Sequence, residues 1–341
     1  MAEAVANVIR LGAIVVEGQF KPWLITVSGK VHEEVCGLCS DRDPADFLKP
    51  ECRIERLGTL QVKHAVTGVD ESHGTSLRSL VAEARKPSGY AFKMIIERSE
   101  HSDWYSNTWL VADEAEGNAV LIDAGGPVQP LLDRIAELGV TLDAVLLTHH
   151  HYDHIAELTT VLEAHPGTPV LAHPIEREVT EHTTGDLIPG ERLKFGNLEF
   201  DLLLTPGHTA GMVALVLDGE TKEVFTGDTL FLGSVGGVRA PGHTTFEDLR
   251  ASVMDTLLTL PPETIIRPGH SESSTVADEL ANNAFVRIWR GLDAEGSGAC
   301  KVNGEEADLI LLGPDYDGGH KAWVRWPDGS DDLVPGSVVE R

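Results

Sequence analysis

One stretch of this sequence decides the fold, residues 144–154, which read Ala144-Val145-Leu146-Leu147-Thr148-His149-His150-His151-Tyr152-Asp153-His154. Its apolar first half predicts a buried strand. Its second half gathers four histidines and an aspartate within six positions. A strand could not keep these side chains on one face, because alternate residues of a strand point opposite ways, but a loop could. We therefore predict a metal-binding loop, with His149 and His151 turned to one ion and Asp153 and His154 to a second.

Taken alone, this segment could also be an exposed histidine-rich loop that binds metal adventitiously. Three later segments argue against that alternative, because each places a further ligand type just after an apolar run. His208 follows residues 202–204, Asp228 follows residues 224–225, and His270 follows residues 265–266. Imidazole nitrogen suits zinc and iron, and carboxylate oxygen widens the choice to manganese. Four such strand ends predict one metal-binding rim.

The order His-x-His-x-Asp-His, followed by His, Asp and His, resembles the metallo-β-lactamase superfamily over about residues 91–292. The resemblance implies an α/β fold, the αββα sandwich, in which two mixed sheets pack face to face with helices outside and metals at one edge. It assigns the ligands to two metals and a bridge: His149, His151 and His208; Asp153, His154 and His270; and Asp228 between them.

This assignment implies two divalent cations, zinc first, with iron or manganese also fitting. Two cations about 3.5–4 Å apart need an anionic bridge, which Asp228 and a shared hydroxide supply. The hydroxide would attack a carbonyl while the metals stabilise the charge that develops. Asp153 and Asp228 are therefore the candidate catalytic residues, with Asp153 suited to orient the hydroxide.

Within the superfamily, the histidines after Thr148 and the residues around Asp228 look most like glyoxalase II, the hydroxyacylglutathione hydrolases. That branch implies a thioester or ester substrate. Two departures weaken glutathione specificity, since Gly237 and Ser273 stand where the branch has a glutathione-binding lysine and tyrosine. Its helical C-terminal domain is also replaced here by a small β module.

Two other functions stay open. The persulfide dioxygenases share the fold and hold one iron with residues that match His149, His208 and Asp228, a set this chain contains. That family's arginine is absent at Gly237. A non-catalytic metal-binding or regulatory protein is the third alternative, which the complete ligand set disfavours. Asp228 stands where many β-lactam-cleaving members have cysteine, so that activity is disfavoured too.

Several residues near the predicted rim are candidates for lesser roles. Arg239 and His243, in the loop after Asp228, could bind a substrate carboxylate, although exposed loop residues without a role are the more ordinary interpretation. Trp104 and Tyr105 could line the pocket mouth or simply pack. His150 and Tyr152 face away from the metals in the simplest geometry, so they are either supporting or purely structural residues.

The chain of 341 residues predicts three parts: an N-terminal accessory module at 1–89, the catalytic domain at 90–294, and a small C-terminal β module at 295–341. In the first part, strands are expected at 8–16 and 23–27. In the second, Thr244 and Glu247 form a predicted capping box ahead of a helix over 246–260. A last helix is expected over 277–290, ending at Gly291.

Composition narrows the partners and the compartment. A formal net charge of −27 disfavours nucleic acid and anionic membranes as partners, leaving a small-molecule substrate, with a homo-oligomer also open. No apolar run is long enough to span a membrane, and the start lacks the positive charge of a signal peptide, so we expect a cytoplasmic protein.

Four cysteines are too few for a disulfide scaffold, which agrees with that compartment. Cys36, Cys39 and Cys52 could bind zinc if His32 or His64 supplied a fourth ligand, although ordinary reduced cysteines are favoured. The fourth, Cys300, has no obvious partner.

Overall fold

The computed structural model describes residues 8–16, 19–26 and 94–341 of the chain, which divides into two compact units, Met1–Pro87 and Ser88–Arg341. In the first unit, strands β1 (Val8–Val16) and β2 (Gln19–Thr26) pair antiparallel. The first strand has the predicted bounds, whereas the second begins four residues before the predicted range 23–27 and ends one residue before its end. The proposed zinc ligands Cys36, Cys39, Cys52, His32 and His64 lie outside the described residues.

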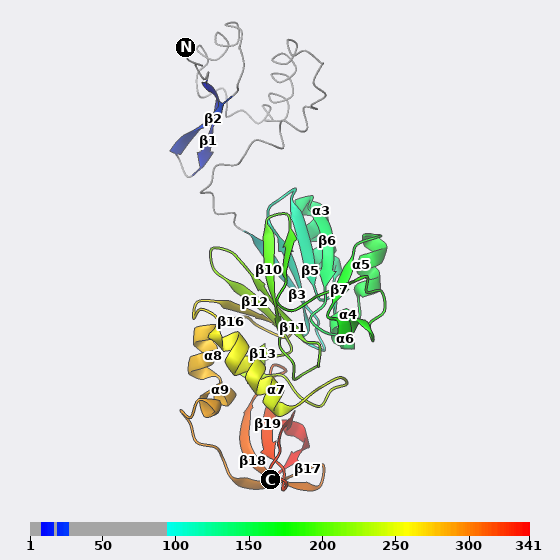
Figure 1. Ribbon diagram of the computed structural model, residues 1–341, viewed down its shortest axis with the longest axis vertical. Helices are drawn as coiled ribbons and strands as arrows, with labels where there is room; N and C mark the ends of the chain where they lie inside the picture. The colour runs from blue at the N-terminus through cyan, green and yellow to red at the C-terminus, as the bar shows by residue number, and fades with distance from the viewer. Residues whose placement is uncertain (1–7, 17–18, 27–93) are drawn as a thin grey trace. The chain divides into compact units, whose positions relative to one another are not determined.

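Two six-stranded sheets form the body of the second unit (Figure 1). The first has the order β3-β4-β5-β6-β7-β8, with parallel pairing from β5 onward, and comprises β3 (Ile95–Glu100), β4 (Asn107–Ala112), β5 (Asn118–Ile122), β6 (Thr141–Leu146), β7 (Val170–Ala172) and β8 (Gly185–Asp186). The second has the order β16-β15-β12-β11-β10-β9, parallel only between β12 and β15, and comprises β9 (Arg192–Phe195), β10 (Leu198–Leu204), β11 (Val213–Leu217), β12 (Glu223–Gly227), β15 (Ile265–Pro268) and β16 (Ser274–Thr275).

The sheets bury their inner faces against each other. Val111 and Val120 of the first sheet lie in one apolar cluster with Phe200, Leu215 and Phe225 of the second. Helices cover the outer faces: α3 (Gln129–Leu138), α4 (Tyr152–Ile155), α5 (Leu158–Ala164) and α6 (Pro174–Arg177) follow strands of the first sheet, and α7 (Phe246–Ala251), α8 (Val276–Asn282) and α9 (Ala284–Trp289) follow strands of the second. The predicted αββα sandwich is confirmed.

Two helix predictions were wrong in detail. The helix expected over 246–260 is α-helical only to Ala251, then continues as a π-helical segment (Ser252–Thr256) and a 3-10 turn (Leu257–Thr259). Its cap is Thr245, whose Oγ1 accepts a 3.0 Å hydrogen bond from the Asp248 amide, and not Thr244.

The single helix expected over 277–290 is instead two helices, α8 and α9. Asn283 separates them because its backbone is extended, with φ −66° and ψ 119°. Its side-chain oxygen then accepts hydrogen bonds from the amides of Phe285 and Val286, which caps α9.

The C-terminal residues form a five-stranded antiparallel sheet of order β20-β19-β18-β17-β21, made of β17 (Gly298–Val302), β18 (Glu305–Pro314), β19 (His320–Arg325), β20 (Asp331–Pro335) and β21 (Val339–Glu340). One face of this sheet extends the core of the sandwich, since Trp323 packs against Phe246 at 5.2 Å between ring centroids and lies near Trp289. The boundary predicted at 294/295 stays a prediction.

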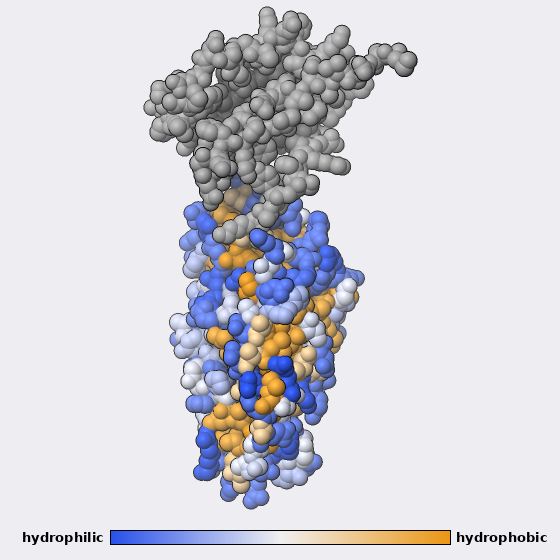
Figure 2. Space-filling model, turned by 90° about the vertical axis from the view of Figure 1, so that its left-hand side faces the viewer, coloured by the Kyte–Doolittle hydropathy of each residue, from blue (hydrophilic) through white to orange (hydrophobic). Residues whose placement is uncertain are grey.

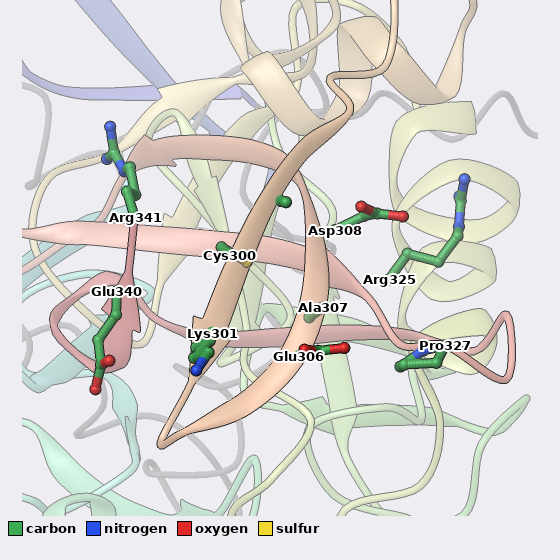
Figure 3. A pocket seen from close by; sticks show the side chains of 10 residues that line it. Cys300, Lys301, Glu306, Ala307, Asp308, Arg325, Pro327, Glu340 and Arg341 are labelled. Carbon is green, nitrogen blue, oxygen red and sulfur yellow. The ribbon is translucent and has the colours of Figure 1, made fainter.

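The C-terminal sheet carries a pocket of about 710 Å³, which we call the outer pocket (Figure 3). Its lining is Ala299, Cys300, Lys301, Glu306, Ala307, Asp308, Arg325, Pro327, Glu340 and Arg341. On the face drawn in Figure 2, hydrophobic residues gather in patches between hydrophilic ones. Among the described residues, none of the helices has the length and hydropathy needed to cross a membrane.

Candidate metal centre

All seven predicted ligands follow the carboxyl ends of strands and lie together at one edge of the sandwich. His149, His151, Asp153 and His154 come after β6, with the last two in α4. His208 follows β10, Asp228 follows β12 and His270 follows β15. Directly after Asp228 and Thr229 comes a short hairpin made of β13 (Leu230–Phe231) and β14 (Ser234–Val235). Their ligand atoms form overlapping groups: His149, His151 and His208; His149, His154 and Asp228; Asp153, His154 and His270.

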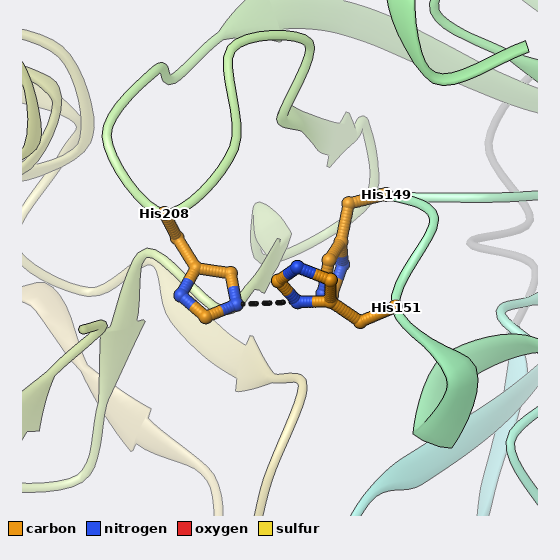
Figure 4. Close-up of side chains that lie close together, drawn as sticks. All are labelled: His149, His151 and His208. Carbon is orange, nitrogen blue, oxygen red and sulfur yellow. Dashed lines mark hydrogen bonds between the residues drawn. The ribbon is translucent and has the colours of Figure 1, made fainter. Parts of the chain in front are cut away.

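The separations between these atoms match a metal's coordination shell. Two ligand atoms that each lie 2.0–2.1 Å from a tetrahedral zinc are roughly 3.3 Å apart. His270 Nε2 lies 3.4 Å from both His154 Nε2 and Asp153 Oδ2. In the other group, His208 Nε2 lies 2.9 Å from His151 Nδ1, and Figure 4 shows these rings and that of His149 turned toward one another.

Asp228 lies between the two groups. Its Oδ2 is 3.4 Å from His208 Nε2 and 3.1 Å from His270 Nε2, and its Oδ1 is 3.3 Å from His154 Nε2. A carboxylate so placed can ligate an ion in either group, or bridge two.

Hydrogen bonds on the outer side of each ring fix which nitrogen faces inward. His208 Nδ1, His270 Nδ1 and His151 Nε2 each lie 2.8–2.9 Å from a backbone carbonyl, which can only accept. Those nitrogens therefore carry the proton, and the opposite nitrogen offers its lone pair to the centre. The carbonyl acceptors belong to Gly237, Trp104 and Pro241, respectively. Asp123 holds His154 Nδ1 at 3.0 Å, and the Thr148 hydroxyl lies 3.0 Å from His149 Nδ1.

Two buried ligand atoms have no hydrogen-bond partner among the described residues, His149 Nε2 and Asp228 Oδ1. Leaving a buried polar atom unpaired costs on the order of 1–3 kcal/mol, and more for a charged group. Both atoms lie within the ligand groups, so a bound cation would satisfy them. The donor set, imidazole nitrogen with carboxylate oxygen, fits zinc, iron or manganese.

Burial and charge set the protonation of the site. Burial lowers the pKa of His208 to about 4 and also lowers the pKa of His149 and of His151, so these rings are neutral and ready to ligate at neutral pH. For His154 burial acts in the same direction, but the carboxylates of Asp228 and Asp123 outweigh it and raise its pKa. Burial likewise opposes the charge of Asp228, yet His270 and His154 hold its pKa low.

Glycine lets the loops approach this closely. At Gly269, in the Pro-Gly-His segment, an added Cβ would lie only 2.3 Å from Asp228 Oδ1. Any side chain there would therefore displace a ligand, which explains the residue before His270.

The sequence prediction missed two buried carboxylates that support the ligands. Glu176, in α6, accepts hydrogen bonds from the His150 amide at 3.0 Å, the Thr209 hydroxyl at 2.7 Å and the Gly211 amide at 2.8 Å, and it pairs with the His150 ring. It thus ties the loop after β6 to the loop after β10. Only its position after a short strand could have signalled it.

Asp123 is the second missed residue. It directly follows β5 and has φ 59°. It accepts hydrogen bonds from the amide and hydroxyl of Thr148, and its other contact holds His154 Nδ1. Its place at another strand end on the same edge was a usable signal.

The remaining candidates have varied surroundings. Arg239 forms a 2.8 Å ion pair with Asp332 of the C-terminal sheet, which occupies its charge, and His243 is exposed. Trp104 and Tyr152 pack edge to face at 5.5 Å and are both partly exposed.

Comparison with known proteins agrees with this geometry. Residues 101–270 match the family model described as metallo-beta-lactamase superfamily. The chain is 32% identical to hydroxyacylglutathione hydrolase GloC of Haemophilus influenzae over 57% of this chain and 98% of that protein. Among solved structures, it is similar to the BLEG-1 B3 metallo-beta-lactamase (27% identity, TM-score 0.53, 56% of this chain and 99% of that one) and to ETHE1 from Myxococcus xanthus (30%, 0.51, 59% and 92%).

Proposed function

The chain belongs to the metallo-β-lactamase superfamily, and from that premise we propose that it is a hydrolase that uses two divalent cations, zinc first, to cleave a thioester or ester. One observation carries the proposal. His149 Nε2 and Asp228 Oδ1 are buried inside overlapping groups of ligand atoms without a hydrogen bond to any described residue, and Asp228 lies between the groups. Bound cations would supply an acidified water and polarise the substrate carbonyl.

The chain's own residues would orient this chemistry. Asp228 would bridge the two ion positions, and the outward hydrogen bonds of the histidines would keep their lone pairs directed inward. Asp153 has a side chain 29% exposed, whereas His149, His154 and His270 are fully buried. Substrate would therefore approach from the side of Asp153, whose carboxylate could orient the attacking water.

We do not propose that the enzyme is specific for thioesters of glutathione. Gly237, which aligns with the glutathione-binding lysine, contributes only its carbonyl, and that carbonyl holds His208. GloC is named for an acylglutathione, so we carry over the thioester class and not the thiol. We expect a small-molecule substrate, a cytoplasmic setting, and neither nucleic acid nor membrane as partner.

A second candidate is a persulfide dioxygenase with one iron. It is supported by one feature, the closeness of His208 Nε2 to Asp228 Oδ2 at 3.4 Å beside the unpartnered His149 Nε2, which makes a two-histidine, one-carboxylate set. The unused ligands Asp153 and His270 argue for the two-metal proposal.

The test is metal content of protein purified without added metal, combined with thioester hydrolysis and with oxygen uptake on a persulfide. Two metals per chain with hydrolysis and no oxygen uptake would support the proposal. One iron with oxygen uptake would replace it with the dioxygenase, and metal without either activity would point to a binding or regulatory protein.

A further inference from the structure

The C-terminal sheet brings an aromatic side chain to the metal centre. Tyr316, in the turn between β18 and β19, stacks on the ring of His270 with centroids 4.1 Å apart and planes 18° from parallel. Phe231 packs edge-on against both rings, at 5.5 Å from His270 and 5.1 Å from Tyr316. A residue more than forty positions after the last ligand thus forms part of the site's wall.

A buried ion pair fixes this turn in place. Lys321, only 6% exposed, lies 3.1 Å from Asp315 Oδ1 and donates to the Val235 carbonyl at 2.5 Å. The same Asp315 oxygen accepts hydrogen bonds from the Ser234 hydroxyl and the Tyr316 amide. Since Ser234 and Val235 form β14, the turn is anchored to the hairpin that follows Asp228, and Tyr316 is held in a defined position.

The hydroxyl of Tyr316 is available to a ligand. It makes no hydrogen bond to any residue of the described range 94–341, although the side chain is half-buried. Burial, and then the carboxylates of Asp228, Asp315 and Asp153, raise the pKa of Tyr316, which agrees with a phenol close to both ligand groups. A half-buried donor without a partner beside a reaction centre is suited to contact substrate.

A second aromatic residue, Trp104, contacts His270 through its backbone carbonyl. The Trp104 carbonyl accepts the His270 Nδ1 proton at 2.9 Å, and the Trp104 ring, 37% exposed, stacks on His101 and contacts Tyr152. The partly exposed Trp104 ring, packed on Tyr152 next to Asp153, offers apolar area that a charged group would not use.

Three cations close to His270 in the chain or in the fold are already paired. Arg98, which also donates to the carbonyl of the next residue, Ser271, forms a 2.7 Å ion pair with Glu272. Arg267 pairs with Glu223, and Lys321, beside the Tyr316 ring, pairs with Asp315. A substrate carboxylate near these residues would have to displace an acidic partner. The surroundings therefore favour an uncharged group.

We propose that Tyr316 is a substrate-contacting residue, and that with Trp104 it forms an aromatic wall that selects an uncharged, aromatic acyl group next to the bond that is cleaved. This inference rests on the proposed hydrolase function for its kinetic test. It assigns the C-terminal sheet a role in specificity, because the sheet delivers Tyr316.

The kinetic test compares benzoyl and acetyl thioesters of N-acetylcysteamine, an uncharged thiol, as substrates of the metal-loaded enzyme. We expect wild type to prefer the benzoyl group in kcat/KM, and Tyr316→Ala to reduce that preference by about tenfold through loss of the ring contact. Tyr316→Phe, which keeps the ring, should retain the preference but lower kcat/KM for both substrates about 3–10-fold. Leu292→Ala, which truncates an exposed apolar side chain outside the candidate site, should change neither value.

Metal content separates this role from a structural one. If Tyr316→Ala lost metal and slowed both substrates equally, Tyr316 would be a mere support for His270 and the inference would be overturned. If wild type cleaved no thioester, the proposed function would fail, yet binding of the non-cleavable S-benzyl-N-acetylcysteamine would still test the wall. About tenfold weaker binding to Tyr316→Ala than to Leu292→Ala is expected there, and equal binding would sink the inference.

Discussion

The metal centre and the outer pocket are two polar regions of the same unit, and they differ in how their polar atoms are satisfied. In the outer pocket, Arg325 is paired with Asp331 at 2.8 Å and with Glu295 at 2.8 Å, and Glu306 and Asp308 are exposed to water. At the metal centre, His149 Nε2 and Asp228 Oδ1 are buried and have no hydrogen-bond partner among the described residues. The outer pocket is a hollow whose charged groups are paired or solvated, whereas the metal centre contains buried atoms that require a ligand.

The physical reason is the cost of burial. A charged group at the surface is stabilised by water, so a hollow lined with such groups needs nothing further. A buried carboxylate among neutral imidazoles is unstable unless protons or cations compensate it. Buried histidine and aspartate atoms that lack hydrogen-bond partners and lie together as possible ligands therefore mark the functional region better than the size of a hollow does.

The sharpest test of this contrast substitutes one aspartate in each region. Asp228→Ala removes the carboxylate between the ligand groups, so we expect loss of bound metal and a fall in hydrolysis of more than about 100-fold, beyond the 10–100-fold typical of residues that only support a ligand. Asp308→Ala in the outer pocket should leave both unchanged. Full metal content and activity in Asp228→Ala would remove the basis of the proposed site.

A smaller loss of metal affinity or activity is expected from substitution of Glu176, a supporting carboxylate that the sequence did not reveal. Glu176→Gln weakens the link between the loops after β6 and β10, so metal affinity or activity should fall about 10–100-fold. The matched variant Glu306→Gln, in the outer pocket, should behave as wild type. Metal titration of both proteins decides the matter, and identical affinities would show that Glu176 only fills space.

Acid should destabilise the metal-free protein because it protonates His208, a buried histidine of the metal centre. The pKa of His208 is about 4 when folded and about 6.5 when unfolded, so the unfolded state binds more protons between these values. Keeping His208 neutral contributes about 3 kcal/mol to the free energy of unfolding above pH 6.5, and this contribution is lost as the pH falls toward 4. The raised pKa of His154 acts oppositely, giving stability that is lost as pH rises through that pKa.

Urea unfolding at several pH values measures this effect, and His208→Gln isolates it because the variant lacks the titrating ring. The free energy of unfolding of the metal-free variant should fall less steeply than that of wild type between pH 6.5 and 4. Equal slopes would contradict the assigned burial of His208.

The smallest effects are expected for two paired arginines. Arg239→Ala and Arg325→Ala each remove a surface ion pair, so each should change the free energy of unfolding by no more than about 1 kcal/mol. Neither should change KM. A large rise in KM for Arg239→Ala alone would show that Arg239 binds substrate, as one sequence interpretation held.

The ligand types and their place at strand ends were predicted because they are written locally, and the sandwich was predicted from the family resemblance that these residues carry. An apolar strand followed at once by His149, His151, Asp153 and His154 needs no distant information, and the carboxyl ends of neighbouring strands meet at one edge of a sheet. The break at Asn283 escaped prediction because helical spacing continues through it. The cap at Thr245 was missed because Thr244 and Thr245 are adjacent and carry the same hydroxyl, so only the backbone geometry decides which one caps the helix.

What the sequence alone determined is the set of seven candidate ligands and the fold that gathers them. What only the tertiary structure decided is what surrounds them: that Glu176 and Asp123 support the ligands, that Arg239 is already paired, and that Tyr316 reaches His270. These contacts join residues distant in the chain, through side chains whose local sequence shows no period or motif. The ligands are fixed by chemistry and spacing, whereas the neighbours that set specificity are fixed by packing.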